Sequence, residues 1–79
     1  MNITYYAGAA DAAGVSGTQL DTMELTAAQL TALLGQGNPR LAEVLPRCTL
    51  LVDGAPVCNP ADVIAAGARV DVLPPFAGG

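Results

Sequence analysis

The sequence lacks histidine, lysine and tryptophan, and only three of its 79 residues are aromatic. Without histidine, the chain has neither the commonest acid–base group at neutral pH nor the commonest nitrogen ligand for metals. The chain therefore lacks the histidine on which zinc catalysis and hydrolysis by a serine–histidine–aspartate triad usually depend, and we expect no metal site. Three arginines against seven acidic residues give a net charge of −4, which disfavours nucleic-acid binding because phosphate contacts need clustered cations.

Long hydrophobic runs are also missing. No window approaches the roughly 18 consecutive apolar residues of a membrane span, and the first residues do not have the basic and apolar segments of an export signal. We therefore expect a cytoplasmic protein that does not enter a membrane. In that compartment Cys48 and Cys58 are interpreted as two small buried hydrophobic residues rather than a disulfide. A reactive Cys48, activated by the neighbouring Arg47, is the alternative.

The length allows only a small core. A chain of this size buries about 60% of the surface that it exposes when unfolded, and 52% of its residues are hydrophobic with few aromatic rings among them. Little material is left to shape a deep reaction pocket. We therefore expect the function to lie on a surface or at a terminus.

The first quarter of the chain predicts two strands joined by an enlarged connection. Residues 2–7 are β-branched and aromatic, and they predict a strand with Ile3 and Tyr5 on one face. Residues 9–13 are expected to form a helical turn, and residues 18–24 a second extended run. The two strands are expected to pair as a hairpin.

The main helix has the clearest start signal. Thr26 followed three residues later by Gln29 is a capping box, in which each side chain bonds the other residue's backbone N–H. Leu30, Leu33 and Leu34 then fall on one face of the predicted helix. We expect this face to be buried against the sheet.

The second half predicts a short helix and two further strands. Asn38-Pro39 is a second helix start, and this helix is expected to end at Pro46. Residues 48–52 are a compact apolar run followed by Asp53-Gly54, the strongest short hairpin signal in the chain. A turn beyond this hairpin is expected to place Ile64 in the core.

The last predicted strand covers residues 68–73. Alternation along a strand places Val70 and Val72 on the inner face, with Arg69 and Asp71 on the outer face. The resulting order is ββαββ with small helical inserts. This order predicts an α+β domain with one main helix across one face of a mixed sheet.

The opposite face of that sheet has no predicted second layer. Its outward residues are expected to include Leu51 and Leu73, with Phe76 just beyond. Together they would form an exposed apolar patch, which in a small protein usually marks a partner site. A strand register shifted by one residue would bury these side chains instead.

The end of the chain is unlike a core strand. Pro74 and Pro75 cannot donate to a sheet, so the chain is expected to leave it there. Ala77, Gly78 and Gly79 have almost no side chain, and glycine lets a backbone approach another molecule closely. We expect a single domain over residues 1–79 whose flexible tail, residues 74–79, delivers a carboxylate to another protein's active site.

These features together resemble a known family. The tail, the Leu-Val-Asp-Gly turn at 51–54, the opening strand that ends at Tyr6-Ala7 and the total length are similar to the MoaD/ThiS sulfur carriers. The tail is the specific part, and Pro74-Pro75 is most like the MoaD branch, the small subunit of molybdopterin synthase. The resemblance implies a ubiquitin-like β-grasp fold.

The resemblance also implies a mechanism and partners. An E1-like enzyme of the MoeB/ThiF type would use ATP to adenylate the Gly79 carboxylate, and a persulfide donor would convert the adenylate to a thiocarboxylate. The large subunit of molybdopterin synthase, of the MoaE type, would then accept the tail and supply the catalytic lysines. This chain would be a non-catalytic sulfur-donor subunit without a bound cofactor, since it has no glycine loop for ATP. Gly78 would give access, and the partner contacts would be Leu51, Leu73, Pro74, Pro75, Phe76 and Ala77.

Other functions are consistent with the same residues. The carrier could serve cysteine, thiamin thiazole or secondary-metabolite synthesis instead of molybdopterin synthesis. A β-grasp module that binds a partner through its open face, without tail chemistry, is a further alternative. A stand-alone enzyme is disfavoured because histidine, lysine and a nucleotide loop are all missing.

Overall fold

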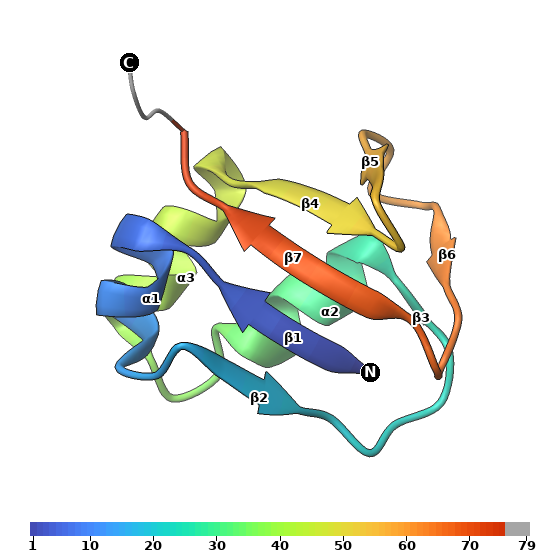
Figure 1. The fold of residues 1–79 in the computed structure, drawn as a ribbon, viewed down its shortest axis with the longest axis horizontal. Coiled ribbons are helices and arrows are strands. Elements are labelled where there is room, and N and C mark those ends of the chain that lie inside the picture. The colour runs from blue at the N-terminus through green and yellow to red at the C-terminus, as the bar shows by residue number, and fades with distance from the viewer. Residues whose placement is uncertain (76–79) are drawn as a thin grey trace.

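A five-stranded mixed sheet forms one layer of the molecule, and helices cover one of its faces (Figure 1). The structure is a computed structural model that describes residues 1–75. The elements follow in the order β1 (Asn2–Tyr5), α1 (Ala7–Ala13), β2 (Gly17–Gln19), β3 (Leu25–Thr26), α2 (Ala27–Leu34), α3 (Pro39–Val44), the 3₁₀ turn η1 (Leu45–Arg47), β4 (Thr49–Val52), β5 (Ala55–Val57), β6 (Val63–Ile64) and β7 (Arg69–Leu73).

The last strand in the sequence lies at the centre of the sheet. The strand order is β2-β1-β7-β4-β5, with β1 parallel to β7 and the other neighbours antiparallel. Since β1 and β7 run in the same direction, Met1 lies at one end of the sheet, and β7 leads to Pro75 at the other (Figure 1). The Met1 ammonium is fixed there, because it donates to the carbonyls of Leu20 at 2.7 Å and Ala66 at 2.8 Å.

The core lies between the sheet and the helices. Alternation along β1 and β7 turns every second side chain toward α2, as predicted. The largest fully buried side chains come from β1, α2, β6 and β7: Ile3, Leu30, Ile64, Val70 and Val72. This arrangement of a mixed sheet with its main helix on one face confirms the expected α+β architecture.

The capping box predicted for the main helix is present. The Gln29 backbone N–H donates to Thr26 Oγ1 at 3.1 Å, and the Thr26 backbone N–H donates to Gln29 Oε1 at 2.9 Å. The buried face of α2 is narrower than expected, however. Leu30 and Leu34 are buried, but Leu33 is 38% exposed, because α2 is rotated so that Leu33 lies at the edge of the stripe facing the sheet.

Asn38 caps α3 and also connects it to α1. Its Oδ1 accepts from the Leu41 backbone N–H at 3.1 Å, while its Nδ2 donates to the Ala12 carbonyl at 3.0 Å. The helical segment does not end at Pro46 as expected, since η1 continues through that residue to Arg47. Proline is compatible with this position near the start of a helical turn.

The Asp53-Gly54 hairpin is formed as predicted. Both residues have positive φ, 50° for Asp53 and 85° for Gly54, which is the geometry of a two-residue type I′ turn. The turn joins β4 to β5 with Leu51 opposite Pro56. Ile64 is in the core as expected, but its pairing with Leu25, between the two-residue strands β6 and β3, was not predicted.

Two predicted boundaries near the N-terminus were wrong. The first strand ends at Tyr5 rather than residue 7, because Ala7 has a positive φ of 48° and begins α1. The second strand is only Gly17–Gln19, although it pairs antiparallel with β1 as expected. Within residues 1–75, none of the helices has the length and apolar character needed to cross a bilayer.

Candidate functional site

The predicted partner residues that the structure describes lie at the end of β7 and beside it. Leu73 is the last residue of β7 and is partly buried; Pro74 is partly buried and Pro75 is exposed. Four predicted site residues lie outside the described residues: Phe76, Ala77, Gly78 and Gly79. Their roles therefore stay predictions.

We call the sheet surface turned away from the helices the outer face; it carries Thr4, Tyr6, Thr49, Leu51, Pro56, Arg69, Asp71 and Leu73. Paired residues share a face, and Leu51 lies between Pro56 on β5 and Asp71 on β7. Thr49 pairs with Leu73, so Leu51 and Leu73 are diagonal neighbours. Both leucines are partly exposed on the expected face. The register is therefore the predicted one, not the version shifted by one residue.

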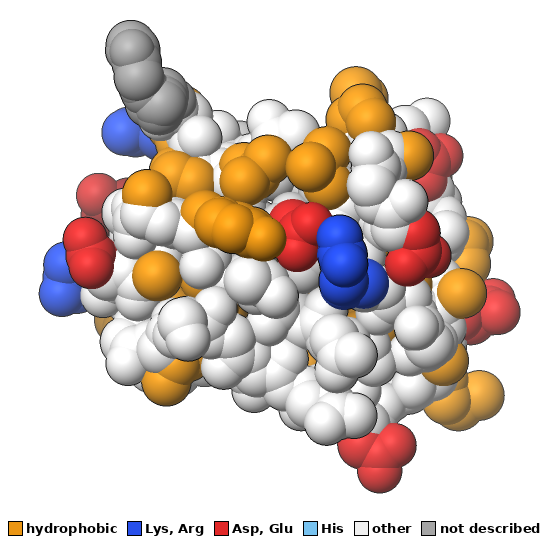
Figure 2. Space-filling view, viewed as in Figure 1, with side chains coloured by type: hydrophobic (Ala, Val, Ile, Leu, Met, Phe, Trp, Pro, Cys, Tyr) orange, Lys and Arg blue, Asp and Glu red, His pale blue; other side chains and the backbone are white. Residues whose placement is uncertain are grey.

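Hydrophobic side chains form a row across the outer face. In Figure 2 the row runs from the end of β7 toward β5, and charged side chains of both signs lie beside it over β7. Leu51, Leu73 and Pro56 come together in this part of the face by their register. The sheet thus presents apolar surface that continues from the base of the tail.

Tyr6 is a further exposed residue of this face, and it was not among the predicted site residues. Tyr6 is 42% exposed, and its backbone N–H donates to the Val72 carbonyl at 3.1 Å, which holds it beside β7. The signal was present in the sequence. A strand that turns Tyr5 inward must turn the next residue outward.

Asp71 is the polar centre of the outer face. It is only 7% exposed, although it lies on the predicted outward side of β7. The Tyr6 hydroxyl donates to Asp71 Oδ1 at 3.5 Å, and Arg69 Nη2 lies 3.7 Å from Asp71 Oδ2. A carboxylate is therefore enclosed by its neighbours beside the hydrophobic row of the outer face.

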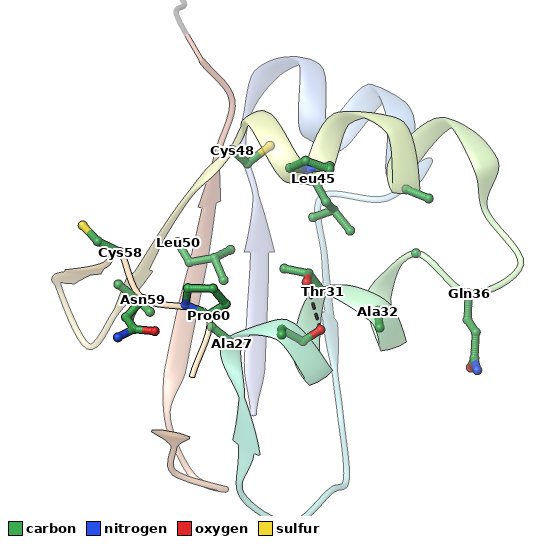
Figure 3. A pocket seen from close by; sticks show the side chains of 15 residues that line it. Ala27, Thr31, Ala32, Gln36, Leu45, Cys48, Leu50, Cys58, Asn59 and Pro60 are labelled. Atoms are coloured by element: carbon green, nitrogen blue, oxygen red, sulfur yellow. Dashed lines mark hydrogen bonds between the residues drawn. The ribbon is translucent and has the colours of Figure 1, made fainter. Parts of the chain in front are cut away.

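A groove of about 610 Å³ lies on the other side of the sheet, between α2, η1 and the segment after β5 (Figure 3). Its described lining is uncharged and mostly apolar, with Leu45 and Leu50 at its base and Asn59 at its rim. Among residues 1–75, no cluster of three potential metal-ligating side chains is formed. The lining does not supply an acid–base pair for catalysis.

Both cysteines border this groove as free thiols. Cys48 is half-buried and donates from Sγ to the Val44 carbonyl at 3.4 Å. Burial raises the pKa of the Cys48 thiol, so the structure does not support the alternative of an activated thiolate. Cys58 is exposed, and its interpretation as a buried hydrophobic residue was wrong, because the chain leaves the sheet after Val57.

Comparisons with known proteins agree with this architecture. The model of the ThiS family matches residues 3–79. No curated protein matches the chain at a significant level.

Three solved structures of similar proteins share the fold. The crystal structure of SAMP1 from Haloferax volcanii is 23% identical, with a TM-score of 0.80 over 100% of this chain and 98% of that one. A second crystal structure, of H. volcanii small archaeal modifier protein 1, is 21% identical, with a TM-score of 0.79 over 96% and 97% of the two chains. A proposed molybdopterin converting factor, subunit 1, from Pyrococcus furiosus is 19% identical, with a TM-score of 0.81 over 95% of each chain. The fold is the ubiquitin-like β-grasp, as expected from the sequence.

Proposed function

This chain belongs to the ThiS family, and on that premise we propose that it is a sulfur carrier that works through its C-terminal carboxylate. The observation that carries the proposal is the course of the last strand. β7 is the central strand of the sheet, and it leads directly through Pro74 and Pro75 to a sequence that ends in Gly78-Gly79. A strand at the centre of the sheet thus precedes a sequence whose last three residues have almost no side chain.

The proposed chemistry takes place on the Gly79 carboxylate. A carboxylate oxygen attacks the α-phosphorus of ATP and releases pyrophosphate, which gives an acyl adenylate. The terminal sulfur of a persulfide then attacks the acyl carbon and releases AMP. A thiol reduces the resulting acyl disulfide, so that the S–S bond breaks and a thiocarboxylate remains on Gly79.

The division of work between chain and partners follows from the composition. The chain has three arginines, no lysine and no glycine loop for a nucleotide, so an E1-like enzyme must hold ATP and neutralise its phosphates. We propose that Leu51, Leu73 and Pro74 contact that enzyme, together with Pro75, Phe76 and Ala77. Gly78 lets the backbone pass close to the nucleotide.

The most specific form of the proposal is sulfur donation to molybdopterin synthesis in the cytoplasm. The Pro74-Pro75 pair supports it, and so does the described assignment of the Pyrococcus furiosus neighbour to molybdopterin conversion. In this form the thiocarboxylate enters a MoaE-type large subunit. Carriers for cysteine, thiamin thiazole or a secondary metabolite would share the activation steps and differ in the acceptor.

The test is the intact mass of the chain after incubation with ATP, an E1-like enzyme and a persulfide donor. We expect the mass increase of one oxygen replaced by one sulfur, located at Gly79 by fragmentation. Deleting Gly79 should abolish the change and leave the melting temperature unaltered, because glycine contributes no side chain to a core. An unmodified full-length chain with E1-like enzymes of every branch would contradict the proposal.

A second candidate function is attachment to other proteins. One of the two crystal structures from Haloferax volcanii is described as a small archaeal modifier protein, and the same adenylate could acylate an amine instead of a persulfide. An amide-linked adduct formed without any sulfur donor would favour this function. A pure interaction module would instead keep its binding after deletion of the tail.

A further inference from the structure

Asp71 occupies an unusual position for a carboxylate. It lies on the central strand, opposite Thr4 of β1 and Leu51 of β4, in the face that the partner would cover. Its exposed fraction is 7% in the free protein. Docking of a partner would therefore remove most of the water that still reaches it.

The contacts within the chain leave this carboxylate weakly paired. Charge-assisted bonds from a guanidinium to a carboxylate are usually about 2.7–2.9 Å long. The Asp71 contacts measure 3.5 Å to the Tyr6 hydroxyl and 3.7 Å to Arg69 Nη2. The Arg69 side chain is 66% exposed, so its ion pair is largely screened by solvent and weak. Acceptor capacity on Asp71 thus remains for a further donor.

A covered carboxylate needs a strong donor. Burial of a charge is costly unless it is paired and hydrogen-bonded. An apolar partner surface would suit Leu51 and Leu73 but would leave Asp71 with its two long contacts. A partner that brings a cation to this point would satisfy Asp71 while it covers the leucines.

The charges near Asp71 also favour a cationic group on the partner. Asp53 lies next to Arg69, whose backbone N–H donates to Asp53 Oδ1 at 3.0 Å. Asp53 thus accepts from the Arg69 backbone, while Asp71 lies 3.7 Å from the Arg69 guanidinium, on a chain with a net charge of −4. An anionic partner group would meet repulsion here.

The ring of Tyr6 favours arginine over lysine as the partner's cationic side chain. Tyr6 is 42% exposed next to Asp71, and a planar guanidinium can stack on an aromatic ring while it donates two bonds to a carboxylate. We propose that Asp71 is a specificity-determining residue of the outer face, and that the partner places an arginine on Asp71 and Tyr6. This inference rests on the proposed docking role of that face.

The first test uses the chain alone and does not depend on sulfur transfer. Methylguanidinium chloride is titrated into the isotope-labelled protein while the Asp71 carboxyl carbon and the Tyr6 ring signals are followed by NMR. We expect saturable shifts that equal concentrations of sodium chloride do not produce and that Asp71→Asn abolishes for the Tyr6 ring. Shifts that are absent, or identical with sodium chloride, would overturn the inference.

The second test uses the E1-like enzyme that adenylates the wild-type chain. Asp71→Asn, which preserves the shape of the side chain, should raise the KM for the chain about tenfold and leave kcat unchanged. Arg69→Gln is the comparison variant and should lower KM, because it frees the carboxylate for the incoming arginine. Melting temperatures show whether both variants are folded.

The outcomes separate this inference from the proposed function. An equal rise in KM for both variants would mean that Arg69 is the partner of Asp71 in the complex, and would overturn the inference, as would an unchanged KM for Asp71→Asn. Failure of every E1-like enzyme to adenylate the wild-type chain would count against the proposed function. The titration would then still decide whether Asp71 accepts a guanidinium.

Discussion

Tyr5 and Tyr6 show how one step along the chain decides a residue's environment. Tyr5 is 5% exposed in the core, while Tyr6 is 42% exposed on the outer face. Burial raises the pKa of Tyr5 above its ordinary value of 10.0, because the apolar surroundings disfavour the phenolate. The folded state therefore holds the Tyr5 proton more tightly than the unfolded state does.

This difference predicts a loss of stability in alkali. A group whose pKa is raised by folding contributes stability below its unfolded pKa and loses that contribution as the pH rises through the folded value. We expect the free energy of unfolding of the wild type to fall above about pH 10, and that of Tyr5→Phe to fall less. Urea denaturation at pH 7 and pH 10.5 measures both. Cys48, whose pKa is also raised from its usual 9.0, is common to the two proteins.

The two cysteines also differ in burial. Cys58 is exposed, whereas Cys48 is half-buried and burial raises its pKa, which lowers both its access to reagents and its thiolate fraction. We expect iodoacetamide to alkylate Cys58 about tenfold or more faster than Cys48. Peptide mass spectrometry over time gives both rates. Equal rates in the folded protein would contradict the burial of Cys48.

At the scale of the elements, α2 depends on its first turn. The helix has only two turns, Ala27–Leu34, and isolated helices of that length are not stable on their own. Thr26→Ala removes one side of the capping box and should cost about 1 kcal/mol of the free energy of unfolding. Thr18→Ala, in the exposed edge strand β2, is the control and should change it by less than about 0.5 kcal/mol. Urea denaturation compares the two; equal losses would show that the cap has no role.

Substitutions at two glycines are expected to change the stability of the protein in opposite directions. A methyl group added at Gly8 in α1 meets no atom within 4 Å, but one added at Gly17 would lie 2.8 Å from the Ile3 carbonyl oxygen. Gly8→Ala should therefore stabilise the protein by about 0.5–1 kcal/mol. Gly17→Ala should destabilise it by about 1–3 kcal/mol, since β2 must move away from β1. Thermal denaturation tests both signs, and a stable Gly17→Ala variant would contradict the close strand approach.

The sequence predicted those elements that have strong local signals. The Thr26–Gln29 capping box, the Asp53-Gly54 turn and the alternation of Val70 and Val72 are each decided by a few neighbouring residues. The pairing of β3 with β6 could not be predicted, because two-residue strands have no period and depend on contacts between distant segments. The exposure of Leu33 likewise depends on how α2 is rotated against the sheet, which its own residues do not determine.

Part of the candidate site could also be predicted from the sequence, and part could not. Period-two alternation is enough to place Leu51 and Leu73 on the outer face from the sequence alone. It did not indicate that Asp71, predicted to be outward, would be buried among its neighbours. Burial on an uncovered face depends on the side chains of three strands together, and only the assembled sheet shows it.

For the whole molecule, the uncovered outer face predicts that a substitution there can abolish function without unfolding the domain. Leu51→Glu should leave the domain folded but raise the KM of the activating enzyme for the chain at least about tenfold. Val63→Glu, at a residue that is 61% exposed on β6, adds the same charge elsewhere and should have no effect. Circular dichroism and adenylation kinetics measure both. Normal kinetics with Leu51→Glu would exclude the outer face as the docking surface.

The parallel pairing of β1 and β7 has a practical consequence for such experiments. It separates Met1 from the base of the tail by the length of the central strand, roughly 16 Å for five residues. A purification handle or biosensor linker attached ahead of Met1 would lie at the far edge of the domain. The immobilised molecule would then present Leu73 and Pro74 to the solution, where an enzyme could reach them unhindered.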